Sequence, residues 1–557
     1  MTKNTCAIGH EKASDPGPGS QDAESLAMGD FGSQPLQRTE TRRDIKSRHA
    51  QMIAIGGTIG TGLFVGIGQA LAISGPLNLL LAYCIICFFV YCIMTATTEV
   101  SSYLPIPGAS MAYYGSRFVS KSLGFAMGWL YFYSFGILVT YEITAAALVI
   151  NYWPNQIHIA VWITIMLVVI VALNFAPVGV YAETEFWFAS TKVFMILGLL
   201  ILSVILCFGG VPSQEGRIGF AYWKDPGAMN EYLVDGAAGR FCAFIYALAF
   251  SVFSFNFGPE LIVITGGEMR APRKNLPRAA KTFIWRLITF YILGALAIGI
   301  ICRSDAAGLL NGGKGAASSP WVIAIKDAGI HTLDSVINAG IIVSAWSSGN
   351  SYLYMSSRSL YSLAKAGNAP SMFQQCTSWG IPLRAVIASS VFGLLAFLNV
   401  SAAVSTVFTW LINLTNTAGF TSWVCCSIIL LRFRKACSKQ EIQVTEVPFR
   451  SCLQPYVAYA CIVFFTCLLF LNGFGVFFPG NWSASSFLTS YIGFPIFITI
   501  YLAHRIWYRN DKWMIPPSEV DLVSGLDYIR TAESLALETI PEHSSNKVVR
   551  TLKRAFS

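Results

Sequence analysis

The chain has 557 residues, of which 54% are hydrophobic and only 12% are charged. A soluble chain of this length carries roughly twice that share of charged residues, so the composition excludes an ordinary soluble protein. The net charge of +9 is spread over short loops and gives no indication of a nucleic-acid partner. Long apolar runs recur along most of the chain, and about 20 apolar residues are enough for one membrane helix.

These runs predict an all-α membrane protein with twelve transmembrane helices. The expected spans are 51–73, 77–103, 121–149, 159–178, 183–208, 241–265, 281–303, 333–358, 382–400, 404–431, 455–476 and 486–508. The eighth is the least clearly bounded, because Trp321–Ile325 fits either this span or a helix in the loop before it. We therefore divide the chain into a permease domain at 49–509 and two polar tails at 1–48 and 510–557, the first of them largely disordered.

Lysine and arginine predict the orientation of the spans. The loop after the sixth span carries five basic residues, and basic residues also flank the other loops on that side of the expected membrane. These five are Arg270, Arg273, Lys274, Arg278 and Lys281. Since basic loops stay in the cytoplasm, both tails are predicted to be cytoplasmic. No cleavable signal peptide is recognised among residues 1–48.

Neither a cofactor nor a metal is predicted. The sequence contains no Walker loop, which argues against an ATP-driven pump on this chain. The 14 cysteines fall mostly inside the expected spans and show no spacing typical of zinc sites or of a disulfide framework.

Glycine interrupts the first span, because four of the seven residues in Gly56–Gly62 are glycines. Unsatisfied backbone groups are costly in hydrocarbon, so such a break persists where it lines a cavity or binds a ligand. Free N–H groups and the positive end of a half-helix beginning near Thr61 form a seat for a carboxylate. The substrate-binding residues predicted here are Thr58, Ile59, Gly60, Thr61 and Gly62. Close helix packing through Gly-x-x-x-Gly spacing is the alternative.

The sixth span is broken at Gly258 and Pro259, because proline removes an N–H group and cannot continue the helix. Carbonyl groups freed by this break are expected to accept hydrogen bonds from an ammonium group. The substrate-binding residues predicted here are Ser254, Phe255, Asn256 and Phe257. A proline kink without a ligand is the alternative. Two broken helices, one opening each half of the chain, indicate a secondary transporter, and an anion seat facing a cation seat fits an α-amino acid.

Ionisable residues inside the spans cost about 2.5–3.5 kcal/mol each, so they are candidate functional residues. Lys192 lies in the fifth span, and burial of its ammonium group would let it exchange a proton near neutral pH. A purely structural lysine is the alternative. Glu142 in the third span either faces the substrate or pairs with a polar neighbour. Glu260 directly follows the second break.

Two further carboxylates close their spans near the expected inner face. These are Glu99, at the end of the second span, and Glu268, at the end of the sixth. For both we expect pairing with loop arginines such as Arg117 or Arg270.

The run from Arg48 to Phe64 resembles the start of a fungal amino acid permease, in the yeast amino acid transporter branch of the amino acid–polyamine–organocation superfamily. Phe186–Lys192, Gly266–Arg278 and Ser344–Ser351 carry further matching motifs, and the resemblance covers about 45–510. It implies an inverted repeat of spans 1–5 and 6–10, followed by two extra helices. It also implies proton-coupled symport of amino acids through the plasma membrane.

The resemblance assigns roles to individual residues. Thr58 to Gly62 would hold the substrate carboxylate, and Ser254 to Phe257 the amine. Lys192 would couple transport to a proton, and Glu142 would face the substrate. By the same analogy, ubiquitin-ligase machinery is expected to act on lysines of the N-terminal tail.

The chain departs from the family pattern around Asn256, at Tyr352 and before Glu142, which indicates a narrow or unusual substrate. Two alternatives stay open: a permease for amines, polyamines or 4-aminobutyrate, and a nutrient sensor that binds without transporting. A membrane enzyme is the weakest interpretation, because the six histidines show no metal-ligand spacing.

Overall fold

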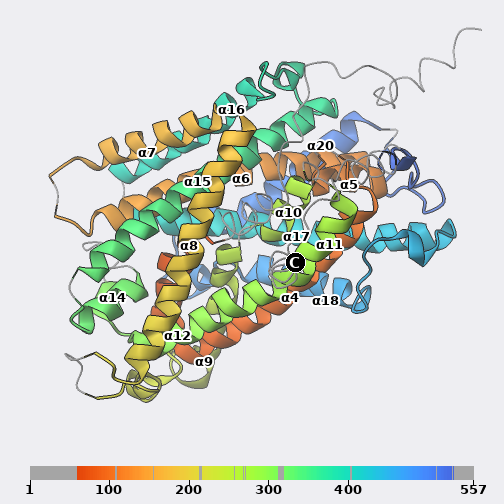
Figure 1. Ribbon diagram of the computed structural model, residues 1–557. Helices are drawn as coiled ribbons and strands as arrows, with labels where there is room; N and C mark the ends of the chain where they lie inside the picture. The colour runs from red at the N-terminus through yellow and green to blue at the C-terminus, as the bar shows by residue number, and fades with distance from the viewer. Residues whose placement is uncertain are drawn as a thin grey trace, which may run out of the picture.

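The computed structural model describes residues 59–531 with short gaps. The gaps are 107–108, 155, 212–215, 256, 267–268, 270, 311–318, 331, 402–403, 510, 528 and 530. Thr58 and Asn256, both predicted to bind substrate, therefore lie outside the described residues, as does Glu268. Helices make up most of the described part of the chain, and no strand occurs among its elements (Figure 1).

Five long helices form the body of the molecule: α4 (Pro76–Tyr103), α6 (Lys121–Ile150), α8 (Val178–Cys207), α15 (Leu333–Lys365) and α17 (Val404–Lys439). The shorter α-helices are α3 (Ile67–Ser74), α5 (Met111–Phe118), α7 (Ile159–Asn174), α9 (Gly236–Ser251), α10 (Gly258–Gly266), α11 (Pro272–Arg286), α12 (Leu293–Ile301), α13 (Ala307–Leu310), α14 (Pro320–Asp327), α16 (Leu383–Ser390), α18 (Tyr456–Leu471), α19 (Ala484–Tyr491) and α20 (Gly493–Trp507). The 3₁₀ and π segments are η1 (Gly62–Gly66), η2 (Trp223–Gly227), η3 (Val252–Phe255), η4 (Leu287–Ile292), η5 (Ser371–Gln374), η6 (Val391–Val400), η7 (Val444–Glu446) and η8 (Phe474–Phe477).

Within the described residues, seven helices are long and apolar enough to cross a membrane, or eight if the bent pair α19–α20 is one span. Shorter apolar helices cover Gly62–Ser74, Ile159–Asn174 and Tyr456–Leu471. Every expected span overlaps at least one helix, and Trp321–Ile325 lies in the separate helix α14. The prediction of an all-α protein with apolar helices is therefore confirmed. The count of twelve spans, the inverted repeat and the domain boundaries stay predictions.

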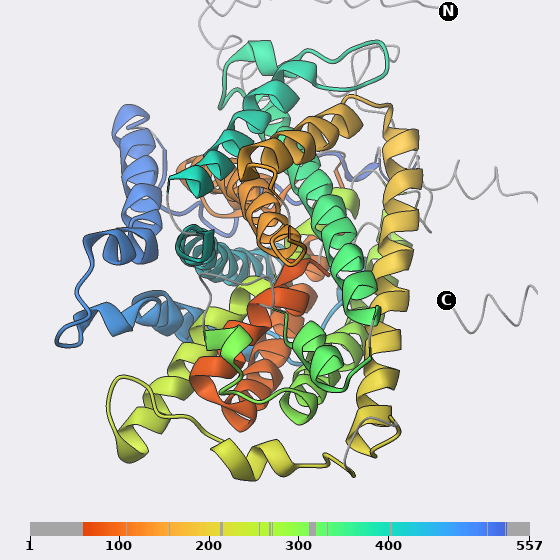
Figure 2. The same cartoon turned by 90° about the vertical axis from the view of Figure 1, so that its left-hand side faces the viewer.

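Helix α6 lies at the centre of the bundle. Most of its apolar stretch is buried, and it packs against α5, α15, α17 and η6. Helix α15 contacts α6 and α8, so it connects the centre of the bundle to α8. In Figure 2, α8 (yellow) runs along one edge of the bundle, and the C-terminal helices (blue) run along the opposite edge. Residues of α6, α8 and α15 can therefore meet inside the protein.

Glu99 pairs with an arginine, although not with one of those expected. Its carboxylate receives Arg434 Nε at 2.6 Å and Arg434 Nη2 at 2.7 Å. Arg434 rather than Arg117 pairs with Glu99, because the end of α17 brings it there, and Arg270 lies outside the described residues. Arg117 instead forms an ion pair with Asp521, at 3.0 Å.

The residues after α20 pack back onto the helical bundle, and we call residues 511–527 the C-terminal strap. The backbone N–H of Ile515 donates to Val119 O at 2.8 Å. Gln440 Nε2 donates to Pro517 O at 2.9 Å and to Val520 O at 2.7 Å. These contacts attach the strap both to the segment after α5 and to the end of α17.

Candidate functional site

The first break brings Thr61 to a buried carboxylate. Ile59 and Gly60 precede the helix, which begins at Thr61 and runs as a π segment over Gly62–Gly66. Thr61 Oγ1 donates to Glu142 Oε2 at 2.8 Å. Both side chains are fully buried. A carboxylate therefore lies at the start of this helix, where free N–H groups favour an anion.

The anion in this structure is the protein's own Glu142. Its other oxygen, Oε1, has no hydrogen-bond partner among the described residues. A Cβ atom on Gly60 would lie 2.5 Å from that oxygen, which is closer than a carbon and an oxygen can approach. Glycine at position 60 thus leaves the space that the Glu142 carboxylate fills. The Glu142 side chain thus lies at the position predicted for a substrate carboxylate, and the binding of substrate there stays a prediction.

The second break is a change of helix type followed by a turn. Helix α9 ends at Ser251, η3 covers Val252–Phe255, and Phe257 has a left-handed backbone with φ of 51°. Gly258 and Pro259 then form the first turn of α10, where the missing N–H of proline is tolerated.

The two breaks are in contact through Phe253. A Cβ atom on Gly62 would lie 2.9 Å from the Phe253 ring, and one on Gly66 would lie 2.1 Å from it. The ring therefore fits against the first break only because both positions are glycines. The packing and binding interpretations of these glycines are compatible, because Gly62 and Gly66 pack while Gly60 leaves room for Glu142.

The carbonyl groups of the second break already accept hydrogen bonds. Ser254 O accepts from the Tyr291 hydroxyl at 3.2 Å, and Phe257 O accepts from the Leu261 N–H at 2.9 Å. Ser254 Oγ also lies 3.0 Å from the Tyr83 hydroxyl. Each carbonyl oxygen retains a second lone pair, so both remain able to accept from a bound ammonium group.

Lys192 lies close to the first break. Its ammonium Nζ donates to Ser348 Oγ at 2.8 Å, and a Cβ atom on Gly60 would lie 3.3 Å from the same Ser348 oxygen. The side chain is 1% exposed and interacts electrostatically with Glu185 and with Glu142. The structure therefore brings Gly60, Thr61, Glu142 and Lys192 together, and their roles stay predictions.

Sequence reasoning missed Glu185. It is fully buried in α8, where Ser347 Oγ donates to its Oε1 atom at 2.8 Å. Two signals were present: Glu185 precedes Lys192 by seven residues, which places both on one face of a helix, and adjacent serines interrupt an apolar span at 347–348.

Glu260 lies past the second break and points toward α17. Its carboxylate accepts from Ser422 Oγ at 2.5 Å and from Trp423 Nε1 at 3.2 Å. Ser422 Oγ in turn lies 2.9 Å from the Tyr131 hydroxyl of α6. Glu260 therefore joins α10 to α17 and α6 near the second break.

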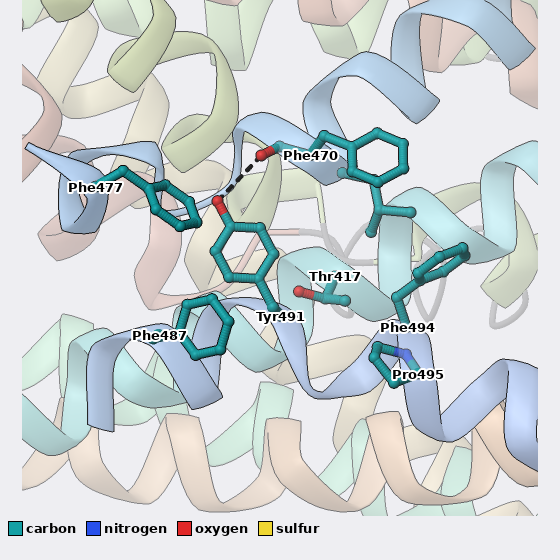
Figure 3. A pocket seen from close by; sticks show the side chains of 8 residues that line it. Thr417, Phe470, Phe477, Phe487, Tyr491, Phe494 and Pro495 are labelled. Carbon is teal, nitrogen blue, oxygen red and sulfur yellow. Dashed lines mark hydrogen bonds between the residues drawn. The ribbon is translucent and has the colours of Figure 1, made fainter. Parts of the chain in front are cut away.

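A separate apolar pocket of about 430 Å³ lies among α17, α18, α19 and α20 (Figure 3). It is lined by Thr417, Leu469, Phe470, Phe477, Phe487, Tyr491, Phe494 and Pro495. Its two hydroxyl groups are engaged, since Thr417 donates to Ser490 O at 2.8 Å and Tyr491 to Phe470 O at 3.0 Å. No charged residue lines this pocket, so it does not suit a zwitterion, and it shares no residue with the two breaks.

Comparison with known proteins gives consistent matches along most of the chain. The family model described as "Amino acid permease" matches residues 49–516. A proline-specific permease of Emericella nidulans is 48% identical over 497 residues, which cover 88% of this chain and 90% of the relative. A probable proline-specific permease of Schizosaccharomyces pombe is 45% identical over 88% of this chain and 90% of the relative. A dicarboxylic amino acid permease of Saccharomyces cerevisiae is 39% identical over 87% of this chain and 80% of the relative.

A solved structure has a related fold. The manganese transporter of Eremococcus coleocola superimposes with a TM-score of 0.50 over 94% of this chain and 98% of the transporter chain. The sequence identity is only 12%, so this similarity concerns the fold alone.

Proposed function

Because the chain belongs to the amino acid permease family, we propose that it is a proton-coupled symporter of a small neutral amino acid, with proline as the first candidate. Relatives that share 39–48% of the sequence are named permeases, so the protein is a transporter rather than an enzyme. The family and the apolar helices together make it a multi-pass membrane protein. The resemblance to fungal amino acid permeases is thereby confirmed.

The observation that carries the proposal is the Glu142 carboxylate at the start of the first half-helix, beside Lys192. A substrate carboxylate needs the same N–H groups. Two unit charges of like sign about 4 Å apart repel by about 4 kcal/mol at an effective dielectric constant near 20. Glu142 must therefore be neutralised, or must leave, before the substrate carboxylate takes its place.

Proton transfer between Lys192 and Glu142 meets this requirement. When the Lys192 ammonium gives its proton to the Glu142 carboxylate, a neutral amine and a neutral carboxylic acid remain. The N–H groups at Thr61 are then free for the substrate carboxylate. The neutral Lys192 amine then takes up one proton from the outer solution, so that binding of substrate and entry of a proton depend on each other, which is the requirement for symport.

The substrate's ammonium group and side chain would face the second break. Carbonyl oxygens of Ser254 and Phe257 retain lone pairs for a secondary ammonium such as that of proline. The rings of Phe253 and Phe257 are buried at the break and offer apolar surface to a small hydrocarbon ring. Two relatives named as proline-specific support this choice of substrate.

A plasma-membrane location, twelve spans with cytoplasmic tails and regulation through ubiquitin-ligase machinery complete the proposal. They rest on the distribution of basic residues and on the family resemblance.

Uptake by purified protein in proteoliposomes tests the proposal. The panel holds proline, other neutral, acidic and basic amino acids, 4-aminobutyrate and spermidine, each with and without an acidic exterior. Proline is expected to accumulate only with the gradient, and a protonophore is expected to abolish accumulation. Accumulation that is independent of pH would contradict proton coupling. Binding without any transport would favour a sensor.

Amine uptake is the second candidate, and the position of Glu142 favours it. An ionised Glu142 that stays at Thr61 blocks a substrate carboxylate but would attract a cation without one. Competition by pyrrolidine, which is proline without its carboxylate, separates the two. Stronger inhibition by pyrrolidine than by proline would support the amine transporter.

A further inference from the structure

Glu185 and Lys192 lie on one face of α8, seven residues apart. At a rise of 1.5 Å per residue, this places them about 10.5 Å apart along the helix axis. Both side chains are buried, with exposed fractions of 0% and 1%. A buried charge inside a membrane protein is costly, so it is retained where it is paired or takes part in function.

Two adjacent serines of α15 each form a hydrogen bond with one of these charges. Ser347 Oγ donates to Glu185 Oε1 at 2.8 Å, and Ser348 Oγ accepts from Lys192 Nζ at 2.8 Å. The second carboxylate oxygen, Glu185 Oε2, is buried and has no hydrogen-bond partner among the described residues. An oxygen in this position has a lone pair available for a proton.

A polar path continues from Glu185 toward the beginning of α8. Tyr181 lies one turn earlier on the same face, and its hydroxyl donates to Ser351 Oγ at 3.4 Å. The Tyr181 ring stacks on Tyr354 at 4.5 Å, and the Arg358 guanidinium lies 4.5 Å from the centre of the Tyr354 ring. With the orientation predicted from the basic loops, this end of α8 is the cytoplasmic end.

The ionisable groups around Glu185 and Lys192 come from α8, α15 and α6. Lys192 on α8 favours the ionised form of Glu185, and Tyr181 contributes a neutral hydroxyl. On α15, Arg358 lies beyond Tyr354 at the inner end of the path. From α6, Glu142 competes with Glu185 for Lys192. The lysine thus lies between two carboxylates, one at the substrate seat and one on the inner side.

We propose that Glu185 is the residue through which the coupled proton leaves Lys192 for the cytoplasm. The proposal rests on the proposed proton-coupled function. After the substrate has left, the recharged Lys192 ammonium transfers its proton to the Glu185 carboxylate, which leaves a neutral amine and a carboxylic acid, and Glu142 returns its own proton to that amine. Glu185 then gives the proton to water at the inner end of α8 and becomes a carboxylate again. Glu142 controls the binding of the substrate carboxylate, whereas Glu185 releases the proton to the cytoplasm.

Replacing Glu185 with glutamine tests the relay, because the amide keeps the shape but cannot carry the proton. The matched control is Glu183→Gln, an exposed carboxylate two residues earlier on α8. Two quantities are measured in proteoliposomes: proline accumulation driven by an acidic exterior, and exchange of labelled for unlabelled proline without a gradient. Exchange needs substrate binding and the alternation of conformations, but no net release of protons.

We expect Glu185→Gln to lose accumulation, so that proline concentrations become equal on both sides, and to retain exchange. Glu183→Gln is expected to behave as the unaltered protein. Accumulation retained by Glu185→Gln overturns the relay. Loss of both activities assigns Glu185 a structural role and also overturns it. If the unaltered protein itself shows no gradient dependence, proton coupling fails rather than the relay.

If Glu185→Gln does not reach the membrane, Ser347→Ala provides the test. This change removes the hydroxyl that donates to the Glu185 carboxylate and leaves the acid in place. It is expected to shift the dependence of uptake on internal pH toward higher pH, because the carboxylate loses a stabilising donor and releases its proton less readily. Glu185→Asp should retain accumulation with a shifted dependence. An unchanged internal-pH profile for Ser347→Ala would contradict the relay.

Discussion

Thr61 Oγ1 donates to Glu142 Oε2 at 2.8 Å, and this hydrogen bond joins the first helix break to the middle of α6. The two residues are 81 positions apart in the sequence and both are fully buried. The contact places a carboxylate of the protein where the half-helix attracts anions. The proposed coupling between substrate binding and the protonation of Glu142 rests on this contact.

Replacing Thr61 with valine removes the hydroxyl and keeps the shape. A hydrogen bond to a charged group contributes about 1.5–3 kcal/mol, so the affinity of the seat for an anion should fall. We expect proline uptake by Thr61→Val to require at least about tenfold more substrate, since 1.4 kcal/mol corresponds to a factor of ten. Thr61→Ser is the control and should stay near the original value. Equal concentration dependence for Thr61→Val and the unaltered protein would contradict the assignment.

A methyl group at position 60 should block the site. In Gly60→Ala, the Cβ atom would lie 2.5 Å from Glu142 Oε1, so the carboxylate must move away from Thr61. Uptake should be lost while the protein still reaches the membrane. Gly198→Ala is the matched control, because a Cβ atom there meets nothing within 4 Å. Both variants are compared for uptake and for the amount of protein at the membrane. Normal uptake by Gly60→Ala would exclude Glu142 from this position.

The contact between the two breaks is tested by a pair of substitutions. Gly66→Ala would place a Cβ atom 2.1 Å from the Phe253 ring, and such overpacking costs about 1–3 kcal/mol. Thermal stability in detergent should therefore decrease. Adding Phe253→Leu removes the ring and should recover part of the loss. If the double variant loses the sum of the two single losses, the glycine and the ring are not in contact.

The C-terminal strap depends on Arg117. Its Nε donates to Asp521 O at 2.6 Å and its Nη2 to Ser524 O at 2.8 Å, in addition to the ion pair with the Asp521 carboxylate. Lysine cannot make these parallel contacts. Arg117→Lys should therefore increase proteolysis of the strap, whereas Lys121→Ala, an exposed control, should not. Equal cleavage rates would show that the strap is held by other contacts.

The ionisation of Asp521 determines how proteolysis of the strap depends on pH. Burial acts to raise the pKa of its carboxyl, but the Ser524 backbone N–H and the Arg117 guanidinium hold that pKa below its ordinary value. A carboxyl whose pKa is lower in the folded protein than in the unfolded protein stabilises the folded state at any pH above its unfolded pKa. This stabilisation is lost as the pH falls through its folded pKa. Asp521 is therefore ionised at neutral pH, and its contribution declines only below about pH 3.9. Proteolysis of the strap should be constant across the neutral range, and an increase near pH 6 would contradict this.

The sequence predicted the part of the site that depends on local chemistry. Glycines, a proline and membrane-embedded charges each have a cost in hydrocarbon, and these costs identified Gly60, Thr61, Glu142 and Lys192. The structure adds partners that come from distant helices. Ser348 could not be assigned to Lys192 without knowing that α15 contacts α8.

Other features depend on tertiary packing and are not readable from a single sequence. Glu183 and Glu185 look equivalent in the sequence, but only Glu185 is buried. The arginine that pairs with Glu99 is set by the position at which α17 ends. That Glu142 occupies the seat expected for substrate follows from the packing of α6 against the first break.

In the proposed mechanism, proline and protons move together through Lys192. Vesicles loaded with a pH-sensitive dye, at equal pH inside and outside, report proton entry when proline is added outside. We predict that proline acidifies vesicles containing the unaltered protein and does not acidify those containing Lys192→Met, which still exchange proline. Proline entry without acidification, or acidification that persists in Lys192→Met, would contradict the account.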